Sequence, residues 1–454
     1  MKPSTARQLK LGLIFLGRRR LGFDQEWGRG QEERARELLG GMSELGIVDP
    51  GEKVVDEASM QRVMAACVRQ SADAIVVLQT TMGDGRLAPT LAQLWPDPVI
   101  LWATPEKPDG DMISSCSLVG THCWASIMRQ LRHAFELVYG DPAKAGVRER
   151  LLEAVRLAAT ARRLRAVRLG LIGGQAPGYF AMAADPFVMQ RSLGVQVQSF
   201  SMLEFSATVH ELDPEAVATD VARIREMGLP HKDTNDDDLP MASRLYLAMR
   251  SYLENERLDA LTVRCWPEMS NVFGQWPYFG IARLVEEGFA VACEGDADGA
   301  LTAWIGESLG LGRCYLSDWL EHDNETITTW HIGAAPLSFS PPPGQPGGPR
   351  IARHFNNKKP SVLEASLIED LPVTIARIWR CDGQYWLSAR EGRTIRPRRN
   401  LMATNGLVKM NNTDPEIWFN DLCHAGMPHH VALFLGRHES CLRRFARIMH
   451  FNII

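Results

Sequence analysis

Short apolar runs alternate with amphipathic stretches through the first third of the chain. The runs at 9–17, 73–80 and 97–104 are continuously apolar, which is typical of strands buried on both faces. The stretches at 31–45 and 59–70, between the first two runs, space their apolar residues as a helix does. This alternation predicts a parallel sheet covered by helices.

The same alternation begins again after a helical stretch. Residues 124–163 are rich in Arg, Ala and Leu and are expected to be helical. The second series comprises a strand opening the segment 167–178, strands at 194–200 and 259–266, and helices at 241–255 and 277–287. We therefore expect a second α/β domain of similar design.

The pattern changes near residue 330. The segment SPPPGQPGG at 340–348 is too rich in Pro and Gly for a helix or a strand, so we expect a surface loop. Short β-rich segments broken by Gly, Asp and Pro follow it, as in an antiparallel sheet or barrel. A last strand at 429–436 and a helix at 438–449 complete the predicted elements.

The predicted fold class is α/β, with two doubly wound Rossmann-like domains followed by a C-terminal, mostly antiparallel β domain. The predicted boundaries are 1–165, 166–330 and 331–454, and a chain of 454 residues has room for several domains. A composition with 45% hydrophobic and 23% charged residues is ordinary for a soluble globular protein.

Net charge and cysteine usage restrict the expected partners and location. A net charge of −4 gives no attraction to nucleic acid or to an anionic membrane surface. No apolar run approaches the roughly 18 residues of a membrane span. The nine cysteines form no CxxC pair, and an odd number without a framework fits reduced thiols in a cytoplasm.

Candidate chemistry lies at the ends of apolar runs. Glu294 directly follows the strand-like run FAVAC, and ligands of open parallel sheets bind outside the carboxyl ends of strands. Asp318 ends the next apolar run, His331 follows the alternating segment ETITTW, and GMPHHV places His429 and His430 at the start of the last strand. Two carboxylates with one or two histidines suit Mn²⁺, Mg²⁺ or Co²⁺.

Simpler interpretations of the same residues stay open. Each acid is also a good cap for the helix that follows it, and each histidine also suits a local hydrogen bond. GLIGGQAPG lacks the spacing of a phosphate-binding loop and favours a tight turn. His122 is expected at a strand-to-helix turn, where it is a candidate for a substrate contact or for a cap.

Several of these segments resemble motifs of the L-fucose/L-arabinose isomerase family. CEGDADGALTAWIGESLG is similar to that family's metal-binding Glu and small-residue helix, and LSDW is similar to its second metal-binding acid. GMPHHVALFLG is similar to the arabinose-isomerase strand that carries paired histidines. VRCWPEM and PVTIARI also have counterparts, so the likeness covers about 260–454.

The resemblance implies a metal-dependent aldose–ketose isomerase acting on a pentose or a 6-deoxyhexose through an enediolate. It implies that Glu294 and Asp318 bind Mn²⁺, or another divalent cation such as Mg²⁺ or Co²⁺, and also move protons. His430 is implied as a metal ligand, and His331 matches a ligand of the arabinose branch that the fucose branch lacks. Members of the family are often hexamers, so a homo-oligomer is expected.

Substrate contacts are assigned to Trp266, Glu268 and His429, together with His122. Because adjacent residues of a strand point to opposite faces, the sequence also predicts that His430 faces Glu294 and that His429 faces away from it.

Two alternatives to an aldose–ketose isomerase remain. One is another enediolate reaction, namely epimerisation, aldol cleavage or decarboxylation, and the other is a non-catalytic sugar-binding protein.

Overall fold

A computed structural model describes residues 8–18 and 23–454 of the chain. The described residues form two compact units. The first contains the residues up to Arg163 together with Arg447–His450, and the second contains Leu164–Ala446 and Phe451–Ile454. Each unit is described separately below.

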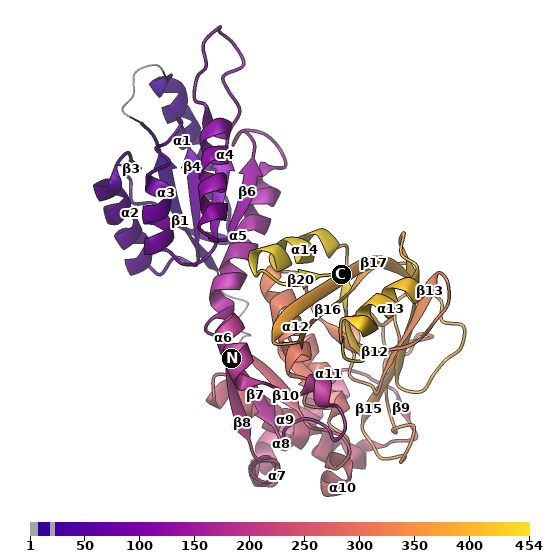
Figure 1. Cartoon of the computed structure of the whole chain (residues 1–454). Helices are drawn as coiled ribbons and strands as arrows, with labels where there is room; N and C mark the ends of the chain where they lie inside the picture. The colour runs from indigo at the N-terminus through magenta and orange to yellow at the C-terminus, as the bar shows by residue number, and fades with distance from the viewer. Residues whose placement is uncertain (1–7, 19–22) are drawn as a thin grey trace. The chain divides into compact units, whose positions relative to one another are not determined.

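The first unit is a doubly wound α/β fold (Figure 1). Its parallel strands are arranged in the order β2-β1-β4-β5-β6, and β3 pairs with the far end of β1. Its elements are β1 (Leu9–Leu16), α1 (Gln25–Gly40), β2 (Leu45–Val48), β3 (Lys53–Val54), α2 (Glu57–Arg69), β4 (Ala74–Gln79), α3 (Leu87–Leu94), β5 (Val99–Ala103), α4 (Ser117–Gln130), β6 (Phe135–Tyr139) and α5 (Val147–Leu164).

Alternating side chains of the central strands build a core on each face of this sheet. Ile14 and Leu16 of β1 pack with residues of α2, α3 and α4. Leu11, Leu13 and Phe15 point the other way and pack with residues of α1 and α5. Burial on both faces explains why these strands are continuously apolar in the sequence.

The second unit begins with a smaller parallel sheet in the order β11-β10-β7-β8. Its elements up to β11 are β7 (Arg168–Ile172), η2 (Phe180–Met182), α6 (Pro186–Leu193), β8 (Gln196–Phe200), α7 (Met202–Glu211), α8 (Pro214–Glu226), β9 (His231–Lys232), η3 (Asp236–Asp238), α9 (Leu239–Asn255), β10 (Ala260–Val263), α10 (Met269–Phe273), α11 (Tyr278–Glu286) and β11 (Ala290–Cys293). From β7 the chain first forms β8 on one side of β7 and then crosses to form β10 on the other side of β7. The crevice between β7 and β10 is therefore the switch point at which open α/β sheets bind ligands.

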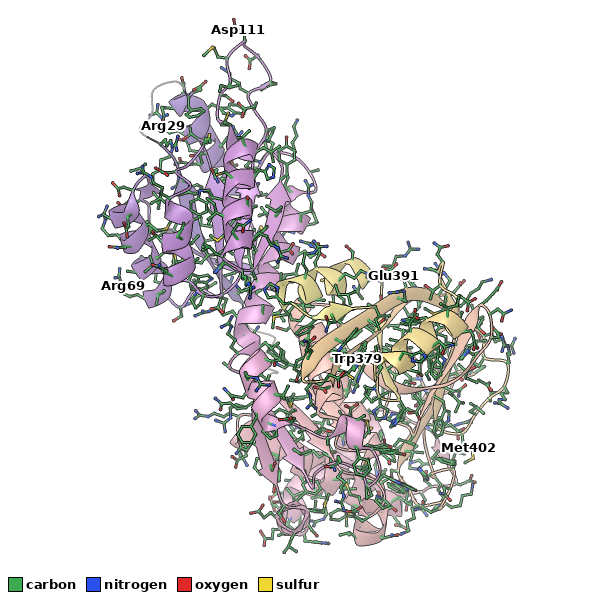
Figure 2. The ribbon with its side chains drawn as sticks, in the orientation of Figure 1. Arg29, Arg69, Asp111, Trp379, Glu391 and Met402 are labelled. Atoms are coloured by element: carbon green, nitrogen blue, oxygen red, sulfur yellow. The ribbon has the colours of Figure 1, made fainter. Side chains whose placement is uncertain are left out.

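The rest of the second unit contains a closed antiparallel barrel. Strands β17, β16, β19, β12, β13 and β18 pair in that order, and β18 pairs again with β17. The remaining elements are α12 (Ala297–Leu309), β12 (Tyr315–His322), β13 (Thr326–His331), η4 (Leu337–Phe339), β14 (Arg350–Ala352), β15 (Val362–Ser366), β16 (Pro372–Cys381), β17 (Gln384–Ile395), β18 (Thr404–Met410), α13 (Pro415–His424), β19 (His430–Leu435), α14 (Glu439–Ile448) and β20 (Asn452–Ile453). Trp379, labelled in Figure 2, is fully buried in the barrel core.

Helix α12 joins the parallel sheet to the barrel. It contacts β7, β10 and β11 on one side and β16 and β19 on the other. Nearly all of its side chains are buried, as expected for a helix that is apolar on every face. Gly306 lies so close to the Phe434 ring that a Cβ there would collide with it. Through these contacts α12 packs β11 and β19 into one unit.

The predicted fold class is confirmed, and one element was wrong. The stretch 124–163, expected to be helical, contains strand β6 between α4 and α5. Strand β6 is an edge strand that exposes Leu137 and Tyr139, so its flanking helix formers dominated the pattern. The three-domain division at 165 and 330 stays a prediction. Among the described helices, none combines the length and apolarity needed to cross a membrane.

Candidate active site

Glu294 occupies a strained turn between β11 and α12. Its φ of 62° lies in the left-handed region, which a non-glycine residue adopts only where the surroundings require it. The Glu294 backbone N–H donates to Cys265 Sγ at 3.3 Å, and its carbonyl accepts from Ala176 N–H at 2.8 Å. These contacts connect the turn to the ends of β10 and β7, so the Glu294 carboxylate lies at the switch point of the sheet.

The other charged residues of the site come from the barrel. Asp318 lies in the middle of β12 and pairs directly with His430, the first residue of β19. Asp318 was expected to end a strand beside β11. It belongs instead to a different sheet, which α12 holds against β11. Two sheets thus supply the two acids.

Four side chains converge at this junction. His430 Nε2 is 3.4 Å from Glu294 Oε2 and 3.7 Å from Asp318 Oδ1. His429 Nε2 is 3.5 Å from Glu294 Oε2 and 3.8 Å from Asp318 Oδ1. Both carboxylates therefore lie within 4 Å of the same nitrogen atoms. Glu294 and His430 are buried, and His429 is exposed at the opening.

Asp296 holds His430 in one orientation. Its carboxylate accepts the Nδ1–H of His430 at 2.8 Å and two hydrogen bonds from Arg377, at 2.8 and 2.6 Å. Asp296, His430 and Arg377 are almost completely buried. Because Nδ1 is occupied by Asp296, the Nε2 atom of His430 is the one directed at Glu294 and Asp318.

The charges in this cluster shift the ionisation of its members. Burial raises the pKa of the Glu294 carboxyl, but His429 and His430 lower it by more, so it lies well below its usual range. Burial lowers the pKa of His430, but its contacts with Asp296 and Glu294 raise it to about 10. Glu294 is therefore a carboxylate at neutral pH, and a proton on His430 balances it.

These residues fit a divalent cation. Glu294 Oε2 and His430 Nε2 are buried, and neither has a hydrogen-bond partner among the described residues. Glu294, His429 and His430 present ligand atoms that all lie within 4.8 Å of one another. Carboxylate oxygens and an imidazole nitrogen with a hydrogen-bonded second nitrogen are common ligands of Mn²⁺ and related ions. A cation would satisfy both orphaned atoms and replace the proton of His430.

His331 lies at the inner side of the cluster. It is buried at the end of β13, and the centres of its ring and the His430 ring are 4.9 Å apart. Its Nε2 is 3.7 Å from Cys293 Sγ. Burial lowers the pKa of His331, so the ring is neutral. The structure thus brings His331 to the predicted site, beside a thiol.

A cavity of about 340 Å³ opens beside the carboxylates. Glu294, Asp318 and His429 line one side of it. Most of the remaining wall is aromatic or aliphatic, including Tyr179, Trp266, Trp319, Trp330 and Phe355. No lysine or arginine is among its described lining residues. Such a mixture of apolar faces and a few convergent polar groups is typical of a small-molecule site.

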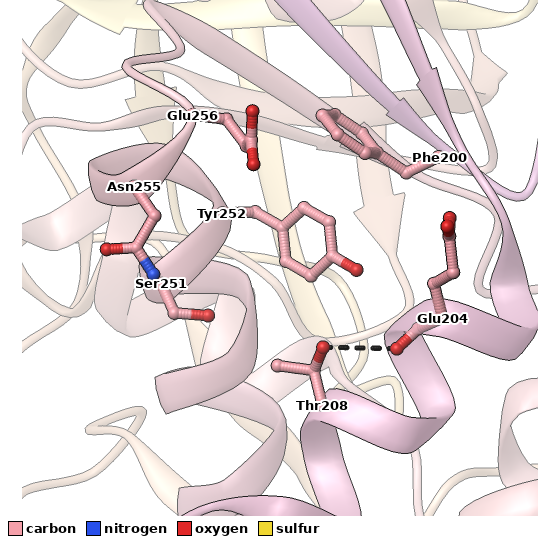
Figure 3. Close-up of a pocket in the computed structure, with 7 residues that line it drawn as sticks. All are labelled: Phe200, Glu204, Thr208, Ser251, Tyr252, Asn255 and Glu256. Carbon is pink, nitrogen blue, oxygen red and sulfur yellow. Dashed lines mark hydrogen bonds between the residues drawn. The ribbon is translucent and has the colours of Figure 1, made fainter.

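A second cavity of similar size, about 330 Å³, lies between the end of β8 and helices α7 and α9 (Figure 3). Its acids already have partners, because Glu204 accepts from Ser201 N–H and Glu256 accepts from Gln198. The Thr208 hydroxyl donates to the Glu204 carbonyl, as Figure 3 shows. Size does not separate the two cavities, but the convergent orphaned groups belong to the first one.

Comparison with known proteins finds similarity to sugar isomerases. Residues 183–309, which include the Glu294 turn and α12, match the L-arabinose isomerase central domain. A sulfoquinovose isomerase from Priestia aryabhattai is 25% identical over 433 residues, covering 94% of this chain and 95% of the relative. Sulfoquinovose isomerases from Alkalicoccus urumqiensis and Clostridium sp. (strain MSTE9) are 25% and 26% identical, over 84% and 74% of this chain and 86% and 75% of the relatives. These matches support the resemblance of the chain to the L-fucose/L-arabinose isomerase family.

Similarity to the arabinose isomerase domain and to sulfoquinovose isomerases identifies the chain as an enzyme, an intramolecular oxidoreductase of the aldose–ketose isomerase class. A solved solute-binding protein of an ABC transporter from Agrobacterium vitis, with bound D-fucose, matches at 9% identity over 67% of this chain and 90% of that protein. Its TM-score of 0.17 is too low to support any inference about this chain.

The predicted orientation of His429 was wrong. His429 was expected to point away from Glu294, yet its Nε2 lies as close to that carboxylate as His430 does. Strand β19 begins at His430, so His429 belongs to the preceding turn and does not follow strand alternation. At this position His429 lines the cavity, which suits the substrate contact assigned to it.

The other assigned substrate contacts differ in their positions. Trp266 lines the cavity. Glu268 forms an ion pair with Arg264 and is not among the residues that line it. His122 lies within helix α4 of the first unit, where it is exposed, and not at the expected strand-to-helix turn. The roles of all three in substrate binding stay predictions.

Sequence reasoning missed the residues that position the site. Asp296 stands only two residues after Glu294, but no local pattern connects it with Arg377, which is 81 residues away. Tyr179, from the GGQAPG turn, lies with its ring 4.8 Å from that of His429. The turn that follows β7 at the switch point was the available signal for Tyr179.

Proposed function

We propose that the chain is a metal-dependent aldose–ketose isomerase that converts its sugar through an enediolate. The observation that carries this proposal is the convergence of Glu294, Asp318 and His430 at the edge of an open cavity, with Glu294 Oε2 and His430 Nε2 left without hydrogen-bond partners. The similarity of the chain to these isomerases supports the reaction class.

Glu294, Asp318 and His430 would hold the cation, with His331 as a further candidate ligand. A divalent cation there, Mn²⁺ or alternatively Mg²⁺ or Co²⁺, would polarise the sugar carbonyl and stabilise the enediolate. Asp296 fixes the imidazole of His430 so that Nε2 faces the cation position. The site thereby keeps its geometry before the sugar enters.

Proton transfer falls to the two carboxylates. The low pKa of Glu294 keeps it ionised, so it is ready to accept the proton of the sugar C–H bond and return it to the neighbouring carbon. Asp318, across the opening, is positioned to move the proton between the two sugar oxygens. The ring of His429 lies between both acids and Tyr179, where it would contact the substrate hydroxyls.

The cavity favours a pentose or a 6-deoxyhexose. Sugars with an apolar end suit the faces of Trp266, Trp319 and Trp330, which lie in the same wall. A second candidate is sulfoquinovose, because the relatives that cover most of the chain are sulfoquinovose isomerases. The described lining lacks a cationic side chain for a sulfonate, and for that reason we place sulfoquinovose second.

The proposal also includes location and assembly. The described cysteines are all free, which agrees with the reduced thiols of a cytoplasmic enzyme. We propose a cytoplasmic homo-oligomer, as the family resemblance implies, with a small-molecule sugar as its partner.

The test is a substrate panel with Mn²⁺. Aldopentoses, 6-deoxyhexoses and sulfoquinovose are incubated with the enzyme, and NMR follows the ketose formed. Ketose formation from one of these sugars is expected. Epimer, cleavage products or CO₂ would instead show another enediolate reaction, and sugar binding without turnover in the presence of Mn²⁺ would show a binding protein.

The catalytic residue is tested with Glu294→Gln, which keeps the size of the side chain and removes its charge. Turnover should fall by about 10²–10⁴-fold, as is usual when an acid–base group is lost. Glu307→Gln is the control, because Glu307 is a partly buried glutamate near the far end of α12, the helix that follows the Glu294 turn. Unchanged turnover in Glu294→Gln would contradict the proposed role.

A further inference from the structure

Cys293 introduces a second type of ligand into the site. It is the last residue of β11, is 2% exposed, and directly precedes Glu294. Its Sγ lies 3.7 Å from His331 Nε2 and 4.0 Å from His331 Nδ1. The Cys293 thiol is not among the cation ligands proposed above.

Cys293, His331 and His430 have the spacing of metal ligands. One ligand atom from each lies within 4.8 Å of the other two, and all three residues are buried. Tetrahedral Zn²⁺, with bonds of about 2.3 Å to sulfur and about 2.0–2.1 Å to nitrogen, places these atoms about 3.5 Å apart. The sulfur–nitrogen distance between Cys293 and His331 already fits.

An unpartnered atom points to a ligand at this position. His430 is completely buried, and its Nε2 has no hydrogen-bond partner among the described residues. The other nitrogen of His430 is held by Asp296. Once His430 loses the proton on Nε2, that atom carries the only lone pair the ring offers, and both sets of ligands need it.

We propose that Cys293, His331 and His430 form a second metal site, selective for a thiophilic cation such as Zn²⁺ or Cd²⁺, and that its occupation excludes a cation from the carboxylate set. Sulfur and nitrogen ligands favour these ions, whereas carboxylates suit Mn²⁺ and Mg²⁺. On binding, the Cys293 thiol and the Nε2–H of His430 each release a proton to solvent, and Sγ and the two imidazole nitrogens donate lone pairs to the ion. The exclusion follows because one lone pair of His430 binds one ion.

The proposal has two parts. Binding of the thiophilic ion does not require turnover and is independent of the proposed function, whereas the competition with Mn²⁺ rests on that function. The probe is Cd²⁺, added to the full-length chain after chelator treatment under reducing conditions. We expect the ultraviolet charge-transfer band of a thiolate–Cd²⁺ bond to rise to one equivalent. Cys293→Ser should lose the band. Cys265→Ser should keep it, since Cys265 is equally buried and lies on the neighbouring strand end but is outside the cluster.

Manganese binding, measured by the EPR signal of free Mn²⁺, separates the two sites. Cys293→Ser should keep Mn²⁺ binding and lose the Cd²⁺ band, while Glu294→Gln should do the opposite. Cd²⁺ should displace Mn²⁺ from the wild type. If the wild type binds no Mn²⁺, the proposed function fails, and the Cd²⁺ result still stands by itself.

The proposal is overturned if the band persists in Cys293→Ser, or if Cd²⁺ and Mn²⁺ bind together. Circular dichroism and thermal unfolding check that each variant is folded. Should Cys293→Ser fail to fold, Cys293→Ala and His331→Gln replace it. A band that persists in either folded variant has the same meaning.

Discussion

At the scale of single residues, Asp296 has the strongest effect on the geometry of the site. Its carboxylate accepts hydrogen bonds from Arg377, from His430 and from the N–H of Gly299 at the start of α12. Asp298, two residues later, is equally buried but pairs with Arg380 and Tyr385 instead. Substitutions of the two aspartates can therefore distinguish an effect on metal binding from an effect on stability.

Asp296→Asn should weaken metal binding as well as folding. Loss of its charge leaves Arg377 buried without a partner, which costs roughly 3–5 kcal/mol of unfolding free energy. It also releases the His430 ring, so Mn²⁺ affinity should fall by about 10–100-fold, as for other partners of metal-binding histidines. Denaturant unfolding and Mn²⁺ titration measure the two effects.

Asp298→Asn is the control for this variant. It should also lose stability, because Arg380 loses its ion-pair partner, and it should keep its Mn²⁺ affinity. Equal losses of Mn²⁺ affinity in both variants would show that Asp296 acts only through the stability of the fold.

His354, in the cavity wall, should make stability depend on pH. Burial, with a contribution from Lys358, lowers the pKa of His354 to about 4 from 6.5. Between these pH values the unfolded chain binds a proton that the folded chain does not. The contribution of His354 to stability is therefore present above pH 6.5 and is lost as pH falls from about 6.5 to 4.

The measurement compares denaturant unfolding of the wild type and His354→Gln across this range. Gln keeps an acceptor for the Asn356 N–H that His354 Nδ1 accepts, but it does not titrate. The difference in unfolding free energy between the wild type and His354→Gln should be constant above pH 6.5 and should change below it. A constant difference down to pH 4 would show that His354 titrates normally in the folded state.

At the scale of elements, the turn between β11 and α12 determines where the catalytic acid lies. Gly295 follows Glu294 with a φ of 76°, and a Cβ on it would overlap the backbone of Gly174 and Gln175. The turn after β7 and the turn after β11 thus approach each other as closely as two backbones can. Only glycine permits this approach.

Gly295→Ala should destabilise the protein and move Glu294. The left-handed conformation alone costs an alanine roughly 1–2 kcal/mol, and displacement of the backbone around Gly174 adds to this. Gly312→Ala is the matched control, since Gly312 has a φ of 87° with open space around it. Thermal unfolding and turnover should both fall more in Gly295→Ala. Equal stability losses would show that the contact with Gly174 adjusts without cost.

At the scale of the whole molecule, the ligand cluster lies entirely within the second unit. Its ligands come from β11, β12, β13 and β19 and the turns beside them, all between Leu164 and Ala446. A cation that binds only the folded state stabilises the part of the chain whose unfolding destroys its site. Compact units of one chain often unfold in separate transitions.

Calorimetry with and without Mn²⁺ should therefore show a selective effect. At 100 times the dissociation constant, Mn²⁺ should stabilise the second unit by about 2.7 kcal/mol and leave the first unit unchanged. Glu294→Gln should lose this shift. A single transition that moves as a whole would show that the two units unfold together.

Much of the fold was predictable from the sequence because its signals are local. The runs that became β1, β4 and β5 are apolar because both faces of each strand are buried, and this shows in the residues themselves. Glu294 stood out in the same way, as an acid at the end of such a run. The edge strand β6 was missed since an edge strand buries little and leaves a weak pattern.

What only the tertiary structure decided is which residues meet. A sequence pattern reports whether a side chain is buried, but it does not name its partner. Glu294 follows a strand of the parallel sheet, whereas Asp318 lies in a strand of the barrel. The two acids meet because α12 packs against both sheets. Arg377 reaches Asp296 because β16 packs against α12, and His429 turns toward Glu294 because β19 starts one residue later than predicted. The acids and histidines were visible in the sequence, whereas their common centre depends on contacts between distant segments.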